Sequence, residues 1–492
     1  MSILRVGYWL ILALGIVWLY TGQAVQHGVL VGNRAMDPDV DWYWGLLWSG
    51  CYAMLGLVPM RVSFAIVGFV LLRFLSPTLT AATYVVQSDG IVAVYSLLGT
   101  LGLLVHLKEQ KRLNLYDWGR LPWVLVIHLF WVGLVWCWSL QYDWYGLKPW
   151  AGHEPWIYVT CGAIFFWGMY GLVDRADILL ICLSLPAVLF FQFLLVLNMP
   201  SIRHGIFREM DFSMLAVICV PLLCYFLLTE RGAGHGILRR KIVVSLSKIA
   251  SGLLVCFFVY LVATNDVRAA ITCLPILGLA WYVISNRKKA MALVGVPVLV
   301  VCVFLIPYLN LSGRFAYGDQ GANAFTSNRL KLWYYAVDAY RAHPVFGVGP
   351  GQFQGYLTHY NATQHTRLTV NHPHNHLLAL LSEQGSLGAI LFVVLIGMTL
   401  SGLYRLSHFC RHEEPGATSR LVFIGLLGFL YMSTFVTEHD HPLIYLFCGL
   451  TAAMSRMISG SVSQDEAMEI ELARVSRKIR DQKKKLLAES SD

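Results

Sequence analysis

Long uninterrupted apolar blocks are the feature of this sequence that most limits what it can fold into. Each block runs for roughly 17 to 25 residues, the length of α-helix that crosses the hydrocarbon core of a bilayer. They dominate a chain of 492 residues that is 57% hydrophobic and 13% charged. Only helices and closed barrels satisfy their backbone in lipid, and these blocks do not alternate in polarity as barrel strands do. We therefore predict an all-α polytopic membrane protein with about 14 transmembrane helices, within a range of roughly 12 to 14.

The predicted spans divide the chain into four regions. Residues 1–309 hold the first spans, 310–375 form one long and partly helical segment, 376–458 hold the last spans, and 459–492 form a basic tail. Loops rich in Lys and Arg, such as 108–120, all fall on one side, which the positive-inside rule assigns to the cytoplasm. We therefore predict that both termini lie in the cytoplasm and the long segment lies on the opposite face, which is the periplasm if this is a bacterial inner-membrane protein.

The densest group of titratable side chains is the stretch NHPHNHLLALLSEQGSLG at 371–388, where the long segment re-enters the membrane. Pro373 disfavours helix at the residue before it, and Asn375 is a good N-cap. We predict a helix that begins close to His374–His376. The unpaired N–H groups of that helix start favour an anion nearby and disfavour a charged histidine. A neutral histidine beside an anion is what a general base needs.

Three histidines of this stretch, His372, His374 and His376, are candidates for such a role. The alternative is that they are loop histidines exposed to water. Glu383 follows His376 by seven residues, which is two helical turns, and therefore shares its face. We predict that this carboxylate orients a histidine or pairs with an arginine.

Cations gather on the predicted outward face, where the positive-inside rule makes them unusual. They include Arg203, Arg208, Arg268 and Arg329. An anionic ligand would explain them, because the guanidinium fork grips phosphate oxygens bidentately without a metal. The alternatives are that Arg208 pairs with Glu209 and that the Arg203 side chain reaches to the lipid interface.

Glycines mark two further places. In the segment 328–353 a helical pattern is followed by glycine at every second position from Gly347 to Gly351. We predict a tight turn there, since no strand precedes it as a phosphate cradle would require. Gly385 and Gly388 are predicted to serve close helix packing.

A metal site is disfavoured. The group TEHDHP at 437–442 also lies on the outward face, but histidines at i and i+2 do not share a helix face and no spacing demands zinc. We expect interfacial solvation or acceptor binding there. The cysteines lie almost all in apolar spans, which indicates buried thiols.

Four segments stand out together by their motifs: RHGIF at 203–207 with Ala216 downstream, NDVRAAI at 265–271, NRLKLWYYAVDAYRAHPVFGVGPGQF at 328–353 and PHNHLLALLSEQGSLGAI at 373–390. They resemble the O-antigen ligase and polymerase superfamily of bacterial membrane glycosyltransferases. The resemblance covers mainly residues 200–400. Its most specific part is the His–Asn element followed by leucines and Glu-x-Gly-x-x-Gly.

The resemblance implies transfer of a glycan from an undecaprenyl-diphosphate carrier to an acceptor hydroxyl at the periplasmic face. It implies inversion at the anomeric carbon and no metal, nucleotide or other cofactor. By the same resemblance His374 is the base, with His376 as its substitute, and two arginines bind the donor diphosphate. The predicted site then comprises His374, Arg268 and Arg203 as catalytic residues and His376, Asn375, Arg329, Arg208, Glu383 and His372 as substrate-binding residues.

Three acceptors are compatible with these motifs: lipid A–core, a growing glycan, and a protein such as pilin. We favour an O-antigen ligase of lipopolysaccharide biosynthesis, because the outward segment is of moderate size and no extra soluble domain is present to hold a protein. The alternatives are a polymerase or a protein O-oligosaccharyltransferase.

The rival from another class is a lipid-linked oligosaccharide flippase or transporter. Transporters tend to carry ionisable residues near the bilayer midplane, whereas here they concentrate at one face, with Arg73 as the exception. We expect membrane lipids around the helices and no nucleic-acid partner.

Overall fold

The computed structural model describes a helical part of the chain. The described residues are 4–13, 51, 53–58, 61–69, 85–109, 120–141, 154–171, 331–364, 373–409, 414–434 and 443–456, with isolated positions at 184, 187, 190, 217, 252–253, 256, 273–274, 276–278 and 280. No strand occurs among these residues, which agrees with the predicted all-α class.

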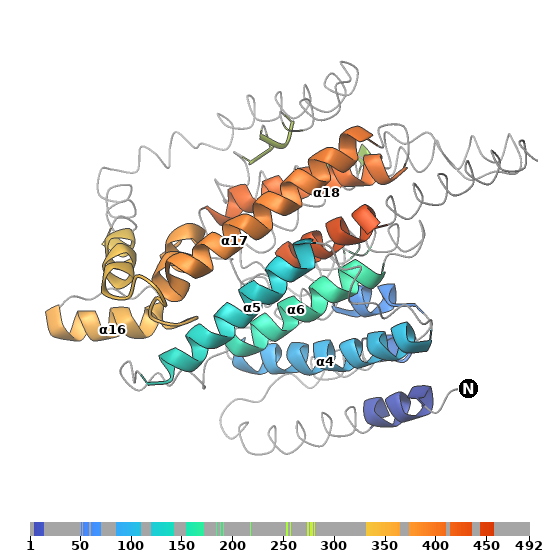
Figure 1. The fold of residues 1–492 in the computed structure, drawn as a ribbon, viewed down its shortest axis with the longest axis horizontal. Coiled ribbons are helices and arrows are strands. Elements are labelled where there is room, and N and C mark those ends of the chain that lie inside the picture. Colours follow the sequence, from blue (N-terminus) through green and yellow to red (C-terminus); the bar gives the residue numbers. More distant parts are fainter. Residues whose placement is uncertain are drawn as a thin grey trace, which may run out of the picture.

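The long helices run side by side, and the short helix α16 lies at an end of them (Figure 1). The labelled helices are α4 (Val85–Glu109), α5 (Arg120–Ser139), α6 (Glu154–Gly171), α16 (Phe353–Gln364), α17 (His376–Phe409) and α18 (Glu414–Ser433). Unlabelled helices span Leu4–Ala13, 331–342 and Leu443–Arg456. Helix α5 contacts both α6 and α17, so it joins the N-terminal helices to those that follow residue 376.

Two helices in the described part are long and apolar enough to cross a membrane, by length and composition. They are Arg120–Ser139 and His376–His408. The first lies in the region predicted to hold the first spans, 1–309, and the second in the region predicted to hold the last ones, 376–458. The total of about 14 spans stays a prediction, because many of them lie outside the described residues.

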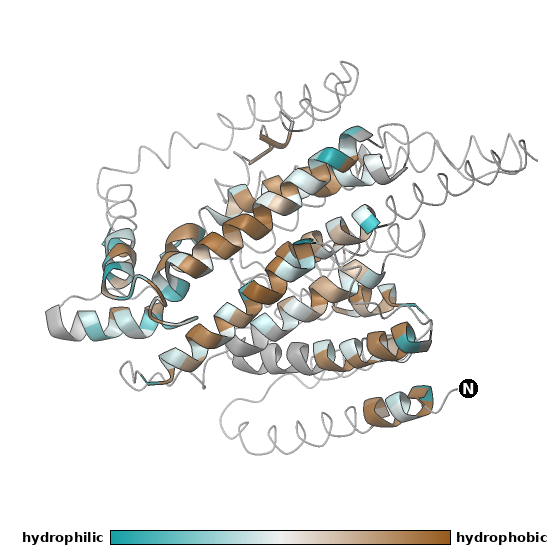
Figure 2. Cartoon of the chain, viewed as in Figure 1, coloured by the Kyte–Doolittle hydropathy of each residue, from teal (hydrophilic) through white to brown (hydrophobic). Residues whose placement is uncertain are grey.

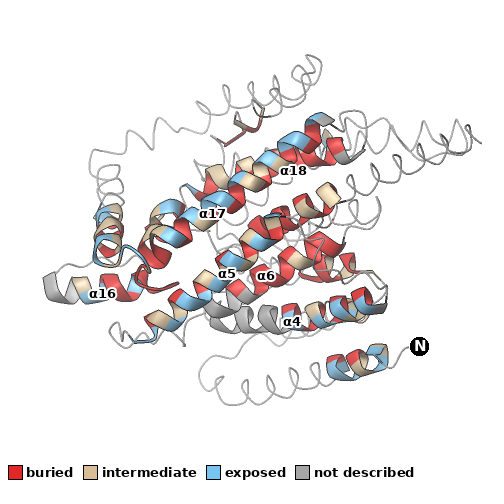
Figure 3. Cartoon of the chain, in the orientation of Figure 1, coloured by how far each residue is buried: buried red, intermediate tan, exposed pale blue. Residues whose placement is uncertain are grey.

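The apolar character of α5 extends to its outward-facing side. Its buried face repeats at helical spacing through Leu125, His128, Val132 and Val135. The opposite face exposes large apolar side chains, namely Trp123, Ile127, Phe130 and Leu134. Figure 2 shows apolar residues in brown and Figure 3 exposed ones in pale blue, and the two colours coincide at many positions of α5 and α17. A soluble helix is polar on its exposed face, so this arrangement fits a helix surrounded by lipid.

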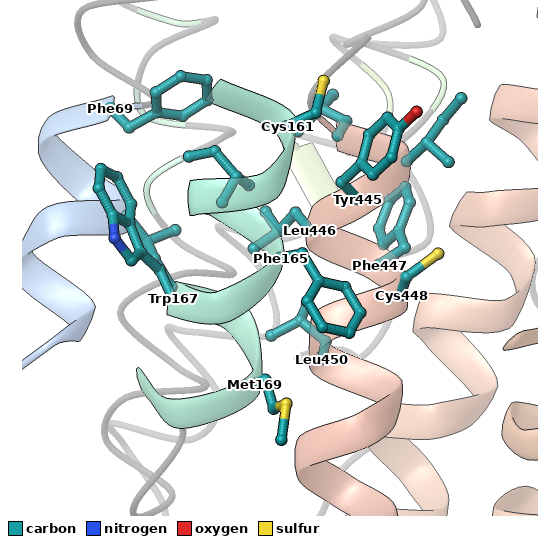
Figure 4. Packing of buried hydrophobic residues seen from close by; sticks show 14 of the residues in the cluster. Phe69, Cys161, Phe165, Trp167, Met169, Tyr445, Leu446, Phe447, Cys448 and Leu450 are labelled. Carbon is teal, nitrogen blue, oxygen red and sulfur yellow. The ribbon is translucent and has the colours of Figure 1, made fainter. Parts of the chain in front are cut away.

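One part of the core lies where α6 faces the helix Leu443–Arg456 (Figure 4). Phe165 and Trp167 are fully buried on α6, and Tyr445 is fully buried on the other helix. The two helices approach closely at Gly168 and Gly449, where a Cβ on either glycine would press on the backbone of the partner helix. Small residues at such crossings allow helices to pack tightly in membranes.

Candidate active site

The helix that carries the histidine stretch begins where the sequence predicts. Helix α17 starts at His376. The Asn375 side-chain Oδ1 accepts a hydrogen bond of 3.0 Å from the backbone N–H of Leu378, and the Asn375 carbonyl accepts one of 2.9 Å from Ala379. This is the geometry of an N-cap. The predicted capping role of Asn375 is confirmed.

His374, the residue before the cap, has an unusual backbone. Its φ is 50°, and within the described residues it is the only residue other than glycine with a positive φ. This left-handed conformation is strained for a residue with a Cβ, by on the order of 1–3 kcal/mol, and such strain tends to collect at functional sites. The side chain of His374 is half-buried.

His376 lies in a different environment. Its side chain is buried, and its ring lies 4.8 Å from the ring of Phe392. The ring of His128 lies 5.9 Å from the same Phe392 ring, and His128 Nε2 is 3.5 Å from the hydroxyl of Tyr445. The structure therefore separates the two histidines. His376 packs in the helical core, and His374 lies at the end of the helix.

Helix α17 is interrupted at Gly385. The φ and ψ of this residue are 69° and −171°, which are not helical values. His376 and Phe392 would be about 24 Å apart along a continuous helix, yet their rings touch. The two arms, 376–384 and 386–409, therefore bend toward each other at an elbow. The span predicted from His376 onward is thus a short arm followed by one long straight helix, and Gly385 does more than pack closely.

The loop 344–351 covers this elbow and replaces the hydrogen bonds that the break removes. The N–H of Val348 donates to Ser382 O at 2.7 Å, and the N–H of Gly349 donates to Glu383 O at 3.0 Å. On the second arm, the N–H of Ser386 donates to Pro344 O at 2.9 Å. The loop therefore holds both arms at once. Glycine is required at the elbow, because a Cβ on Gly385 would collide with the Val345 carbonyl.

The glycines of this loop form the predicted tight turn. Gly347, Gly349 and Gly351 all have positive φ. The N–H of Gly351 donates a hydrogen bond of 3.1 Å to the Oε2 of Glu383. Glu383 is almost fully buried, with 5% of its surface exposed. Its side chain therefore faces the loop from the first arm of α17.

Helix α5 contacts the elbow from the opposite direction. The indole Nε1 of Trp131 donates to Gln384 O at 3.1 Å, which satisfies another carbonyl that the break leaves without a helical partner. The amide of Gln384 donates to the hydroxyl of Tyr158 on α6. Three helices thus converge on a break in one of them.

Aromatic rings secure the loop to α5. The ring of Phe346 stacks between Trp131 and Trp138, with centroid distances of 5.1 and 5.2 Å. The ring of His343 lies edge-on to Trp138 at 5.4 Å. Partial burial lowers the pKa of His343 from its ordinary value of 6.5, because burial disfavours the charged form.

The helix 331–342 and α16 form a small module beside the elbow. They share a core that includes Tyr335, Phe353 and Tyr356. The Tyr356 hydroxyl donates to Asp338 Oδ2 at 2.9 Å, and burial together with this carboxylate raises the pKa of Tyr356 beyond its usual range. Leu378, on the first arm of α17, packs against the same core. The module is therefore attached to the arm that carries the histidines.

Several predicted site residues lie outside the described residues. They are His372, Arg203, Arg208, Arg268 and Arg329, together with Arg73 and the group at 437–442. Of the predicted site residues that the structure describes, His374 and Asn375 directly precede α17, and His376 and Glu383 lie at opposite ends of its first arm. Among these described residues, no group of three His, Cys, Asp or Glu side chains has the geometry to hold a metal ion.

Sequence reasoning missed the elbow and the part that Trp131 plays in it. A signal was present. The polar run Ser382, Glu383 and Gln384 directly before Gly385 is unusual inside an otherwise apolar block, and polar residues there mark backbone groups that need partners.

The elbow lies within the part of the chain that matches a known protein family. Residues 252–393 match the family model described as O-antigen ligase. The matched segment contains the loop 344–351, the first arm of α17 and His374. No curated protein matches the sequence at a significant level.

Proposed function

We propose, from the match of residues 252–393 to the family model described as O-antigen ligase, that this protein transfers a glycan from undecaprenyl diphosphate to an acceptor hydroxyl at the periplasmic face of the bacterial inner membrane. The favoured acceptor is lipid A–core, which makes the protein an O-antigen ligase of lipopolysaccharide biosynthesis. The chain is membrane-associated in this proposal, and the exposed apolar face of α5 supports that part of it.

The observation that carries the proposal is the backbone of His374. A strained left-handed residue persists only where its surroundings hold it. Here the cap at Asn375 and the start of α17 follow at once. His374 thus lies directly before the start of a helix, whose N-terminal dipole favours a neutral imidazole over a charged one and attracts anions. Both properties suit a base that works beside a diphosphate.

In the proposed reaction His374 takes the proton of the acceptor hydroxyl as the oxygen attacks the anomeric carbon of the donor sugar. The bond between that carbon and the diphosphate oxygen breaks, and undecaprenyl diphosphate leaves with the electron pair. Attack from the opposite side inverts the anomeric centre. Arg203 and Arg268 bind the diphosphate and stabilise the charge that develops on it. Arg208 and Arg329 are proposed to assist binding, and no metal is required.

The domain arrangement is part of the same proposal. Residues 1–309 and 376–458 form the membrane region, 310–375 cover the site from the periplasm, and 459–492 lie in the cytoplasm with the N-terminus. The module of helix 331–342 and α16 belongs to the covering segment. Its contact with Leu378 supports a position next to the histidines.

The test is transfer by the purified full-length protein in detergent. The donor is an undecaprenyl-diphosphate-linked glycan, and the acceptors are lipid A–core, a second carrier-linked repeat unit and pilin, each in a separate reaction. Product on lipid A–core alone supports the ligase. Product on the repeat unit or on pilin identifies the polymerase or the protein transferase instead. Product on none of them, with donor crossing the membrane of reconstituted vesicles, overturns the transferase and supports a flippase.

Two substitutions test the assignment of the site. His374→Ala and Arg268→Ala should each reduce transfer at least a hundredfold while the protein still expresses and folds. His359, an exposed histidine on α16, provides the matched control, since His359→Ala should keep transfer within twofold. Full activity of His374→Ala would refute the assignment of His374 as the base. Addition of a chelator should leave the rate unchanged.

A further inference from the structure

We infer that Glu383 is a positioning residue: its carboxylate holds the loop 344–351 across the elbow of α17 and thereby fixes the place of His374. This inference rests on the proposed function and deepens it, because it concerns the same site. It assigns to Glu383 a role that does not involve contact with the substrate.

The elbow needs such a restraint. A single residue with non-helical dihedral angles, Gly385, joins the two arms of α17. Glycine offers little resistance to a change of its own dihedral angles. The angle between the arms is therefore set by the groups that bridge them, and the loop is one such bridge. Its Val348 and Gly349 bind the first arm, while Pro344 binds Ser386 on the second arm.

Glu383 accepts two hydrogen bonds from the loop. Its backbone carbonyl accepts from Gly349 at 3.0 Å, and its carboxylate accepts from Gly351 at 3.1 Å. Because the two bonds reach Gly349 and Gly351 of the same turn, they fix the orientation of the turn as well as its distance from the first arm. The residue Glu383 is 5% exposed, so water does not compete strongly for the Gly351 N–H.

The hydroxyl of Ser386 gives the second arm a matching connection. Its Oγ donates to Pro344 O at 2.9 Å and lies 2.9 Å from the Tyr340 hydroxyl on helix 331–342. Residues on both sides of Gly385 therefore use side chains as well as backbone to hold the same segment. The segment is therefore hydrogen-bonded to α17 on both sides of the break, which restrains the angle between the two arms.

The distance from Gly385 to His374 explains why the angle between the two arms matters for catalysis. His374 is eleven residues from Gly385, about 16 Å along helix geometry, so a swing of about 10° would move it by roughly 3 Å. Displacements of about 1 Å already cost on the order of a hundredfold in rate. The same separation argues against direct contact between Glu383 and His374, because nine residues of helix span about 13 Å.

The decisive variant is Glu383→Gln in the full-length protein, in the transfer assay described above. A glutamine carbonyl oxygen can accept the Gly351 N–H as the carboxylate does, but it carries no charge and cannot act as an acid or base near neutral pH. We expect kcat within about threefold of the wild type and an unchanged pH profile. Glu383→Ala, which loses the acceptor, should reduce kcat at least tenfold, change KM for the donor less than threefold, and leave the shape of the pH profile intact. Ile390, exposed on the second arm, provides the control, since Ile390→Ala should be neutral.

The results separate this inference from the proposed function. A folded Glu383→Gln protein that is as inactive as Glu383→Ala would overturn the positioning role, because the charge would then be needed. Full activity of Glu383→Ala would overturn it as well.

Hydrogen exchange of the peptide 344–352 tests the positioning role independently of transfer and of whether Glu383→Ala folds. Slow exchange in the wild type and in Glu383→Gln supports the positioning role of Glu383, and exchange as fast as in an open loop in either protein overturns it. Failure of the wild type to transfer to any acceptor refutes the proposed function and leaves the exchange experiment valid.

Discussion

The ring of His376 lies against the ring of Phe392, sixteen residues further along the same helix. This contact exists only because α17 bends at Gly385. The bend places the first arm beside the long one instead of above it, so the residues that begin the arm approach the level of Phe392. The residues at the start of α17 therefore lie beside a long apolar helix, and the loop 344–351 packs over the bend.

Gly385→Ala should disrupt this arrangement. The added Cβ collides with the Val345 carbonyl, and alanine is strained at a φ of 69°. Overpacking and backbone strain each cost about 1–3 kcal/mol, so we expect loss of at least about 2 kcal/mol and of most transfer activity. Thermal unfolding in detergent measures the first effect. Gly397→Ala is the matched control, because a Cβ on Gly397 of the same helix meets no atom within 4 Å. Equal stability of the two variants would contradict the elbow.

The two smallest replacements of His374 should reverse the usual order of stability. Alanine ordinarily stabilises a chain relative to glycine because it restricts the unfolded state. At a φ of 50° glycine avoids the strain that alanine retains. We expect His374→Gly to unfold at a higher temperature than His374→Ala, by the equivalent of about 1 kcal/mol, while both lack transfer activity. The opposite order would show that the left-handed conformation is relaxed in the protein.

Asn375→Ala should shorten or loosen the start of α17. The substitution removes the acceptor of the Leu378 N–H, and loss of such a cap typically costs about 1 kcal/mol. Asn375→Ser, which keeps a side-chain oxygen at the cap, should recover most of this stability. The comparison of the two variants by chemical or thermal unfolding checks the cap apart from any part that the asparagine amide plays in binding. A serine variant as unstable as the alanine variant would rule out the cap as the cause.

Gly449→Ala should separate two core helices. A Cβ at this position would press on the carbonyl of Phe165 in α6, and insertion of a methyl group into a tight contact costs about 1–3 kcal/mol. Gly133→Ala on α5 is the control, because the added methyl group meets no atom within 4 Å and alanine favours helix. Unfolding temperatures of the two purified variants give the measurement. No difference between them would mean that the helices can move apart freely.

His343 should make stability depend on pH on the acid side. Burial lowers its pKa in the folded protein below the ordinary value of 6.5, so the unfolded chain binds the proton more readily than the folded one. The stabilising contribution is then fully present above about pH 6.5 and is lost as the pH falls through the lowered value. His343→Phe keeps an aromatic ring against Trp138 and removes the proton. Between pH 7.5 and 5.5 the unfolding temperature of the wild type should therefore fall more than that of the variant, and parallel curves would argue against this account.

The parts of the site that sequence could predict are those set by neighbouring residues. Pro373 and Asn375 specify the start of a helix through short-range sterics and one capping bond, and the start lies at the predicted position. The alternating glycines from Gly347 to Gly351 predict a turn for the same reason, and their positive φ values follow.

The elbow could not be predicted in this way. An isolated glycine such as Gly385 is tolerated within an apolar helix, and its sequence neighbours do not force a break. The break is stable because Pro344 and Val348, about forty residues earlier, and Trp131, 253 residues before Gln384, supply the missing hydrogen bonds. Contacts between residues far apart in the sequence therefore determine that α17 breaks at Gly385. The positions of Arg203, Arg208, Arg268 and Arg329 relative to His374 likewise stay predictions.

The two sets of bonds at the elbow also imply an order of assembly. The loop 344–351 and Ser386 emerge close together during synthesis, and closing a loop of about forty residues is entropically cheap and fast. The bond from Trp131 to Gln384 joins segments 253 residues apart. We therefore expect the bent α17 and its loop to form as a unit soon after the second arm, 386–409, is made, and to dock afterwards against α5, which is made much earlier.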